Sequence, residues 1–468
     1  MALHNTPIPP DQDGLPTRER NWAMLALGIG VSMASLDTAI ANTALPAIAA
    51  QLQTTPAQSV WIINVYQLAM VATVLPFAAL GEIVGYRRVS VFGLALFTLA
   101  SLACACAGSL PALVLARLCQ GIGGSAIMGV NTAMLRVIFP SKMLGRGYGL
   151  NSLIVAISFA VGPTIASLML ALWSWPWLFA INVPLGVYAF FLARRVLPFT
   201  PRAARQLDLR TVLYNVGAFG LLLLAIGDAA HLASVWRIVP EFAVALIFFA
   251  LLIRRQAGDP APLLPVDLFR RPLFTLSALT SVCTFATQSL AFVSLPFFFE
   301  TVLGRSPVET GFLITPWAVL VGVMAPIAGR LSDRYSSGAL GGIGLAALAA
   351  GMLSLVLLPA QPSVLDICWR MALCGVGFGF FQSPNLKAIM GSAPPNRSGG
   401  ASGVVATCRL LGQASGAALV AFCFTVSAQH GTTYALALGA TFAAVACVAS
   451  FSRMFVDGAP ARPASVVK

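Results

Sequence analysis

Apolar stretches of 18 or more residues recur along the whole chain and are separated by short polar segments. At 1.5 Å per residue, each stretch is long enough to cross about 30 Å of hydrocarbon as an α-helix. The chain is 58% hydrophobic and only 9% charged, whereas soluble domains are about a quarter charged. Strands of an outer-membrane barrel would instead alternate in segments of about ten residues. We therefore expect an all-α membrane protein.

The alternation of apolar runs with helix breakers and charges predicts fourteen transmembrane helices. The spans lie near 22–45, 59–80, 89–107, 110–134, 147–171, 176–197, 211–231, 235–253, 273–299, 308–331, 338–359, 364–386, 399–425 and 431–453.

Basic residues indicate the orientation, because positive charge accumulates on the cytoplasmic side of a membrane. With the N-terminus inside, 23 of the 28 Lys and Arg residues fall in cytoplasmic segments and only Arg237 and Arg305 fall outside. Arg117, Arg370 and Arg409 lie within spans. We expect a multi-pass protein of the bacterial inner membrane with both termini in the cytoplasm. The net charge of +13 therefore reflects membrane orientation and does not indicate a nucleic-acid partner.

Cysteine and histidine usage gives no sign of a metal or a cofactor. The nine cysteines lie almost wholly inside apolar segments without a CxxC pair, which is typical of small buried hydrophobic residues. His4, His231 and His430 are too scattered for a metal site. The chain also has no GxxxxGK[ST] sequence, so we do not expect an ATPase domain of its own.

Two short sequence patterns each occur twice, eight spans apart. Gly81–Arg88 after span 2 and Gly329–Tyr335 after span 10 both place an acid and arginines at a cytoplasmic helix end. Arg117–Gly124 in span 4 is echoed by Arg370–Gly377 in span 12. Chance echoes are the alternative, but two parallel six-helix halves with two extra helices between them explain both offsets.

This organisation divides the chain into five parts. They are a cytoplasmic N-terminal tail at 1–21, a six-helix bundle at 22–197, a linker with two extra helices at 198–272, a second six-helix bundle at 273–453, and a cytoplasmic C-terminal tail at 454–468.

These motifs resemble the fourteen-span drug:proton antiporters of the major facilitator superfamily, the EmrB/QacA group, and most closely its YebQ-type transporters. The resemblance covers essentially the whole chain. It implies the major facilitator fold and transport coupled to a proton gradient, with no cofactor. The motifs that carry it are Leu36–Pro46, Gly81–Arg88, Arg117–Gly124, Gly162-Pro163 and Trp177–Gly186.

Some positions depart from the pattern of that family. The loop motif usually has aspartate where Glu82 stands and glycine where Ala78 stands. The antiporter motif in span 5 expects glycine at Ser158, Ala166 and Ser167. All three replacements are small and preserve close packing, but they leave antiport and symport both open.

Asp37 is the one acid well inside a span, and such a residue is costly enough to suggest a function. Arg117 lies at a similar depth in span 4, and small residues share the helix face of each. We predict that Asp37 and Arg117 face each other and carry proton coupling. A static ion pair that fixes two helices is the alternative.

Two further groups of residues are candidates for conformational roles. The resemblance implies that the loop with Glu82, Gly85 and Arg87 latches the outward-open state. We extend this role to Arg88 and to the second copy, whose residues are Arg330, Asp333 and Arg334. Positive-inside orientation is the alternative for the arginines.

Gly162 and Pro163 in span 5 interrupt the hydrogen bonding of the helix backbone and predict a hinge. A simple packing kink is the alternative.

Polar and aromatic residues within spans are candidates for substrate binding, because transporter sites lie near the midplane of the bilayer. An aromatic pocket with one acid would suit lipophilic cations. The candidates follow helical spacing in four spans, although each one taken alone is more often a packing residue: Trp61, Asn64, Gln67, Asn151, Ser158, Phe285, Gln288, Phe292, Phe378, Phe381, Gln382 and Asn385.

The leading hypothesis is proton-coupled export of amphipathic drugs or toxic small molecules by alternating access. Export of one natural metabolite and a non-transporting membrane sensor or scaffold are the alternatives. A scaffold would not need the buried charges, and an enzyme should show a nucleophile with its base or a metal cluster. We expect a monomer with protons, lipid and an amphipathic substrate as partners; a periplasmic adaptor is possible, but no sequence feature supports one.

Overall fold

The computed structural model describes residues 13–54, 61–200, 202–203, 207–230, 235–257, 262–264, 266–359, 361–394, 397–427 and 430–457. Within these ranges the chain is helical and has no strand. Most of the predicted N-terminal tail and residues 458–468 of the C-terminal tail lie outside the described residues.

Fourteen helical segments are long and apolar enough to cross a membrane, so the predicted number of spans is confirmed. The helices are α1 (Thr17–Gln51), α3 (Trp61–Val84), α4 (Tyr86–Ala105), α5 (Leu110–Ile138), α6 (Leu144–Leu172), α7 (Pro176–Ala180), α8 (Asn182–Val196), α9 (Leu209–Ala230), α10 (Val235–Arg255), α11 (Pro272–Phe297), α12 (Pro307–Leu331), α13 (Ser337–Val356), α14 (Val364–Ser392), α15 (Ser398–Val426) and α16 (Gly431–Asp457). The short helix α7 and α8 together form one span.

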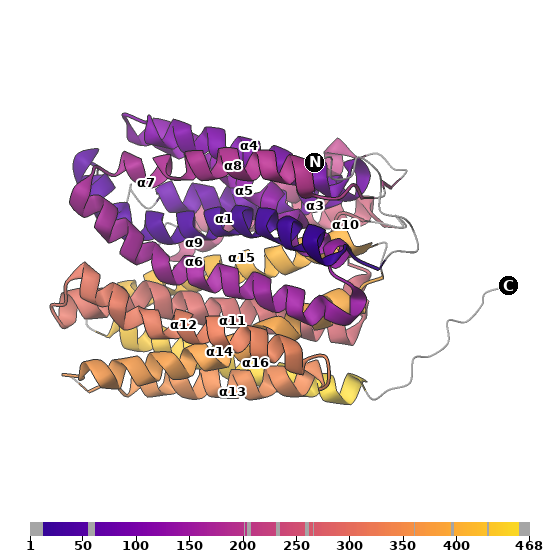
Figure 1. The fold of residues 1–468 in the computed structure, drawn as a ribbon. Coiled ribbons are helices and arrows are strands. Elements are labelled where there is room, and N and C mark those ends of the chain that lie inside the picture. The colour runs from indigo at the N-terminus through magenta and orange to yellow at the C-terminus, as the bar shows by residue number, and fades with distance from the viewer. Residues whose placement is uncertain are drawn as a thin grey trace.

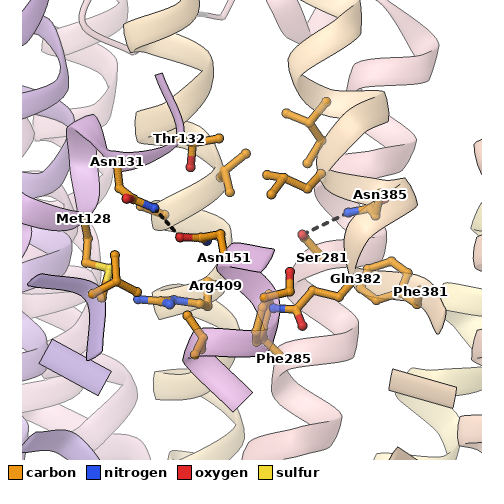
Figure 2. A pocket seen from close by; sticks show the side chains of 17 residues that line it. Met128, Asn131, Thr132, Asn151, Ser281, Phe285, Phe381, Gln382, Asn385 and Arg409 are labelled. Carbon is orange, nitrogen blue, oxygen red and sulfur yellow. Dashed lines mark hydrogen bonds between the residues drawn. The ribbon is translucent and has the colours of Figure 1, made fainter. Parts of the chain in front are cut away.

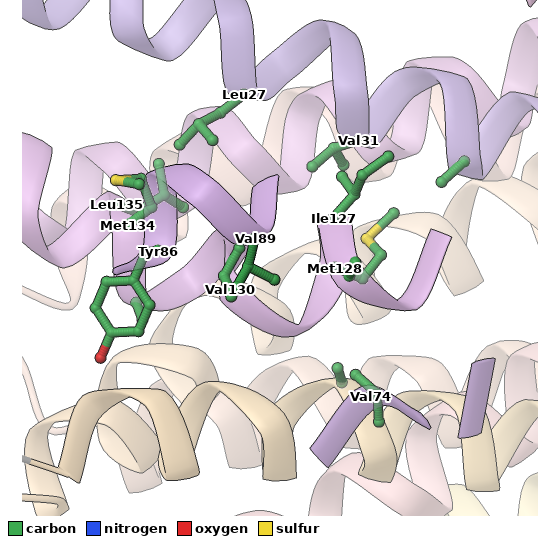
Figure 3. Close-up of a cluster of buried hydrophobic side chains, with 14 of the residues drawn as sticks. Leu27, Val31, Val74, Tyr86, Val89, Ile127, Met128, Val130, Met134 and Leu135 are labelled. Carbon is green, nitrogen blue, oxygen red and sulfur yellow. The ribbon is translucent and has the colours of Figure 1, made fainter. Parts of the chain in front are cut away.

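The helices form two bundles that lie side by side, with the indigo-to-magenta half above the orange-to-yellow half in Figure 1. α6 and α15 lie between the two halves, where α6 packs against α12 and α15 packs against α3. Apolar side chains fill the first bundle around α5. Figure 3 shows Ile127, Met128 and Val130 of α5 next to Val31 of α1 and Val89 of α4.

α9 and α10 form a hairpin at the edge of the first bundle. Phe219 and Phe249 pack edge to face between the two helices, with ring centroids 5.0 Å apart. Asn215 donates a hydrogen bond of 2.8 Å to the Ala72 carbonyl of α3 and so attaches the hairpin to the bundle. The outward face of α10 is apolar and exposed, as expected for a helix in contact with lipid.

The repeated glycines make the same contacts in both bundles. A Cβ at Gly121 of α5 would lie 2.6 Å from the Tyr66 carbonyl oxygen of α3, and a Cβ at Gly375 of α14 would collide with the Trp317 backbone of α12. In each bundle the fourth span therefore packs closely on the second. Small residues permit such an approach between membrane helices. The domain boundaries themselves stay predictions.

Arg453 stands at the end of the last predicted span, and the structure places it inside α16. Its side chain is fully buried, and its Nη1 donates to Ser277 Oγ at 3.0 Å and to Asn385 Oδ1 at 2.7 Å. Arg453 thus links α16 to α11 and α14 inside the second bundle. Sequence position alone could not reveal this, because an arginine at a span end can extend either way.

We predict that Gly375→Ala lowers the stability of the folded protein, by about 1–3 kcal/mol, because the methyl group overlaps the backbone of α12. Thermal unfolding of the purified protein in detergent measures the change. Gly391→Ala is the matched control, since Gly391 lies on the same helix with no atom within 4 Å of the added Cβ. Equal stability of both variants would contradict the close packing of α14 on α12.

Candidate functional site

A buried ion pair joins α1 to α5 inside the first bundle. Arg117 Nη1 donates a hydrogen bond to Asp37 Oδ2, and both side chains have almost no exposed surface. α5 begins after Ser109, whose side chain accepts a hydrogen bond from the Ala112 amide, so Arg117 lies two turns inside the helix. The contact predicted between Asp37 and Arg117 is present.

Neutral polar side chains complete the hydrogen bonding of this pair. Gln120 Nε2 donates to Asp37 Oδ1 at 2.8 Å, and Asn182 Nδ2 of α8 donates to the same oxygen at 3.1 Å. Gln120 also accepts from Arg117 Nη1 at 2.7 Å and donates to Ser101 Oγ of α4 at 2.9 Å. Four helices thus contribute to one hydrogen-bonded network around the ion pair.

Tyr66 of α3 packs against this network. The guanidinium of Arg117 stacks over the Tyr66 ring at 4.2 Å from its centroid. α3 in turn packs against α15, the helix that carries Arg409.

The central cavity lies between the two bundles and has polar walls on both sides (Figure 2). Asn131 Nδ2 of α5 donates to Asn151 Oδ1 of α6 at 2.9 Å, and Asn385 Nδ2 of α14 donates to Ser281 Oγ of α11 at 3.1 Å. The cavity volume is about 60 Å³. Sites for drug-sized ligands measure roughly 300–1,000 Å³, so such a ligand requires the bundles to move apart.

A second, more aromatic cavity adjoins the first and is lined mainly by the C-terminal bundle, with Val155 and Phe159 of α6 on its other side. Phe285 and Phe378 meet edge to face with centroids 5.5 Å apart, as do Phe292 and Trp317 at 5.2 Å. These four rings line the second cavity together with Gln288. The two cavities share only a few lining residues, which are Val155, Phe285, Gln382 and Arg409.

Most of the predicted substrate residues line these cavities. They are Asn151, Phe285, Gln288, Phe292, Phe378, Phe381, Gln382 and Asn385. Trp61, Asn64 and Gln67 line neither cavity, and Trp61 and Asn64 are exposed on α3. Ser158 is buried and donates a hydrogen bond to the Ile154 carbonyl of its own helix.

The loop with Glu82, Gly85, Arg87 and Arg88, which we predict to act as a latch, contacts the second bundle. Glu82 at the end of α3 accepts a hydrogen bond of 2.9 Å from the Gly400 amide, in the first turn of α15. A carboxylate in this position is stabilised by the partial positive charge of a helix N-terminus. Gly85 has φ of 98°, a conformation that favours glycine. Arg87 donates to the Arg194 carbonyl and stacks on Phe199, whereas Arg88 is exposed.

The loop of the second copy, with Arg330, Asp333 and Arg334, makes the corresponding contact from the second bundle to the first. Asp333 lies against the first turn of α6, where a Cβ at Gly145 would be 2.8 Å from Asp333 Oδ1. Lys387 Nζ donates to the same oxygen at 2.6 Å. Arg330 and Arg334 are exposed. Each bundle therefore directs an acid to the start of the fifth span of the other, at the predicted cytoplasmic end.

The predicted hinge lies within a continuous helix. α6 runs from Leu144 to Leu172 through both residues, and a Cβ at Gly162 would overlap that of Ala39 on α1. Gly162 therefore permits close packing of α6 beside the turn of α1 that carries Asp37. The Pro163 side chain lies outside the described part of the chain, and the hinge role stays a prediction.

Several residues of the site were missed by the sequence analysis. Gln120, Asn182 and Tyr66 surround the ion pair, while Arg409 and Asn131 line the central cavity. Arg409 carried a usable signal, because it is a charge within a span. The neutral residues carried no sequence signal beyond their polarity.

Comparisons with known proteins agree with this architecture. The model of the Major Facilitator Superfamily matches residues 27–417. The uncharacterized transporter YebQ of Escherichia coli K12 is 52% identical over 446 residues, covering 94% of this chain and 97% of YebQ. The riboflavin transporter RibZ of Clostridioides difficile strain 630 is 29% identical, covering 89% of this chain and 91% of RibZ.

Two further proteins extend the comparison. The multidrug resistance protein Stp of Mycobacterium tuberculosis strain CDC 1551 / Oshkosh is 31% identical, covering 86% of this chain and 75% of Stp. The crystal structure of the human organic anion transporter MFSD10 superimposes with a TM-score of 0.66 at 14% identity, covering 93% of this chain and 99% of that one, a likeness of fold alone. The chain therefore belongs to the major facilitator superfamily and is a membrane transporter rather than an enzyme.

Proposed function

We propose that this transporter exports amphipathic small molecules in exchange for protons, by alternating access between its two bundles. The observation that carries the proposal is the buried carboxylate of Asp37, which lies in the membrane-spanning region and pairs with Arg117 beside Tyr66 of α3, a helix that packs against α15 of the other bundle. The name of the relative Stp, a multidrug resistance protein, supports drug-like substrates. The proton gradient is then the energy source and no cofactor is required.

Protonation of Asp37 supplies the driving force in this proposal. With Asp37 ionised, the charge of Arg117 is balanced by its counter-ion. A proton on Asp37 leaves a buried guanidinium uncompensated, and loss of one partner of a buried pair costs about 3–5 kcal/mol. This energy is enough to favour a second arrangement of helices in which Arg117 finds new partners.

The contacts between the bundles support alternation. Glu82 joins α3 to α15, and Ser402 Oγ of α15 donates to the Gly129 carbonyl of α5 at 2.7 Å. Arg136 Nη1 of α5 donates to the Met390 carbonyl of α14 at 3.2 Å. These contacts lie toward the predicted cytoplasmic end and close the cavity there. In the proposed cycle they break when the transporter opens to the cytoplasm, on the inner side of the bacterial inner membrane.

We predict that Asp37→Asn lowers substrate-driven proton movement at least tenfold, because an amide cannot carry the exchanged proton. Inside-out vesicles with a pH-sensitive dye would be tested with one anionic, one neutral and one cationic amphipathic dye. Asp366→Asn is the matched control, since Asp366 pairs with Arg370 of the same helix and lies partly exposed near the start of α14.

Two outcomes would count against the proposal. Undiminished proton movement in Asp37→Asn would remove the coupling role and leave the ion pair as a fixed structural link. A wild-type protein that moves none of the three dyes, with or without a gradient, would contradict export of amphipathic molecules.

We also predict that Glu82→Gln loosens the closed end of the cavity. The neutral amide loses the charge-assisted hydrogen bond to Gly400 and the interaction with the N-terminus of α15, together about 1 kcal/mol. Hydrogen exchange of the amides in the first turn of α15 should therefore rise about fivefold. Glu241→Gln on the peripheral helix α10 is the control. Unchanged exchange in Glu82→Gln would show that this contact does not hold the bundles together.

A further inference from the structure

Arg409 occupies a central position that the sequence analysis assigned to no function. It lies on α15 and lines both cavities, at the junction between the polar space of Figure 2 and the aromatic space beside it. Its Nε is buried and has no hydrogen-bond partner, and no ion pair to it is found among the described residues. A guanidinium keeps its proton at any physiological pH, so its charge is permanent.

The charges around the cavity are therefore unbalanced. Asp37, the acid nearest to this region along the network, is already paired with Arg117. None of the described residues that line the two cavities is acidic. An uncompensated charge in the membrane-spanning region is unfavourable, and a bound ligand of opposite charge would remove the cost. The cavity thus lacks the acid that a site for lipophilic cations would need.

Further unpartnered groups surround Arg409. Trp317 Nε1, a donor, and Gln382 Oε1, an acceptor, are both buried without a partner in the described structure. Buried polar groups are nearly always hydrogen-bonded, so these two atoms are available to bind a ligand or water that enters the cavity. Both residues line the second cavity together with Phe285, Phe292 and Phe378.

We propose that the substrate is an amphipathic organic anion, with its acidic group on Arg409 and its apolar body against the aromatic rings of the second cavity. This inference rests on the proposed transport function and names its substrate class. Carboxylates and related oxyanions suit a guanidinium because two parallel hydrogen bonds can form. A flat apolar body suits the edge-to-face rings that line the adjoining space.

The charge of the substrate also agrees with export. A bacterial membrane potential is negative inside and drives anions outward, by about 2.3 kcal/mol for each charge and 100 mV. Exchange of an internal anion for an external proton is therefore favoured by the potential as well as by the pH gradient.

The test compares three probes that share one ring system but differ in charge: 2-naphthoate, 2-naphthamide and a 2-naphthylmethyl trimethylammonium ion. Equilibrium dialysis against the purified full chain in detergent measures the dissociation constant of each. We expect 2-naphthoate to bind at least tenfold more tightly than the other two probes. Arg409→Gln should reduce its affinity to that of the neutral amide, and Arg409→Lys should restore part of the preference.

Arg254→Gln is the matched control, because Arg254 is exposed at the end of the peripheral helix α10. If Arg409→Gln does not fold, the order of the three probes in the wild-type protein still decides. Tighter binding of the cation, equal binding of all three probes, or binding of none would overturn the inference. An anion preference that Arg409→Gln leaves intact would also overturn it.

Failure of the inference is distinguishable from failure of the proposed function. If the cation binds best and is exported in exchange for protons, proton-coupled export stands and the anionic substrate class falls. If 2-naphthoate binds through Arg409 but moves no protons in vesicles, the substrate class stands and proton coupling falls.

Discussion

The ion pair of Asp37 and Arg117 sets the arrangement of the first bundle. Both charges lie where water is absent, so each needs the other and each needs further hydrogen bonds. Gln120 and Asn182 provide them, and in doing so they hold α5 and α8 at fixed positions around α1. The Tyr66 ring of α3 stacks against the Arg117 guanidinium beside this network. A structural link and the proposed proton site are compatible here, because loss of either charge would leave the other one buried without its partner.

The fold was predictable from the sequence because the bilayer leaves few alternatives. Backbone groups in hydrocarbon must bond within their own segment, so length and polarity alone identify the helices. The second copies of the Arg117–Gly124 and Gly81–Arg88 patterns indicated that the chain contains two repeated halves. The structure gives the physical reason for the repeat: Gly121 and Gly375 each allow the fourth span of a bundle to approach the second span closely.

The candidate site was predictable only in part. The depth of Asp37 and Arg117 along their helices was sufficient to predict their contact, because charges at equal depth in the membrane have few other partners. Rotation about the helix axis was not predictable: Trp61 and Asn64 are polar or aromatic like the true lining residues, yet they are exposed on α3. Gln120 lies one turn from Arg117. Burial of its neutral amide costs too little free energy for the sequence to identify it as a member of the site.

The two permanently charged arginines explain why burial of charge has different consequences in the two bundles. Arg117 is balanced within the protein, so its environment changes only when a proton arrives on Asp37. Arg409 has no such partner in the described structure and lines both cavities, so in our proposal its charge is balanced by a molecule that enters the cavity. In the proposed mechanism the first bundle carries the charge that responds to protons, and the second carries the charge that responds to substrate. Tyr66 contacts Arg117 from α3, and α3 packs against α15, the helix of Arg409, so we propose that the two charges are coupled across this interface.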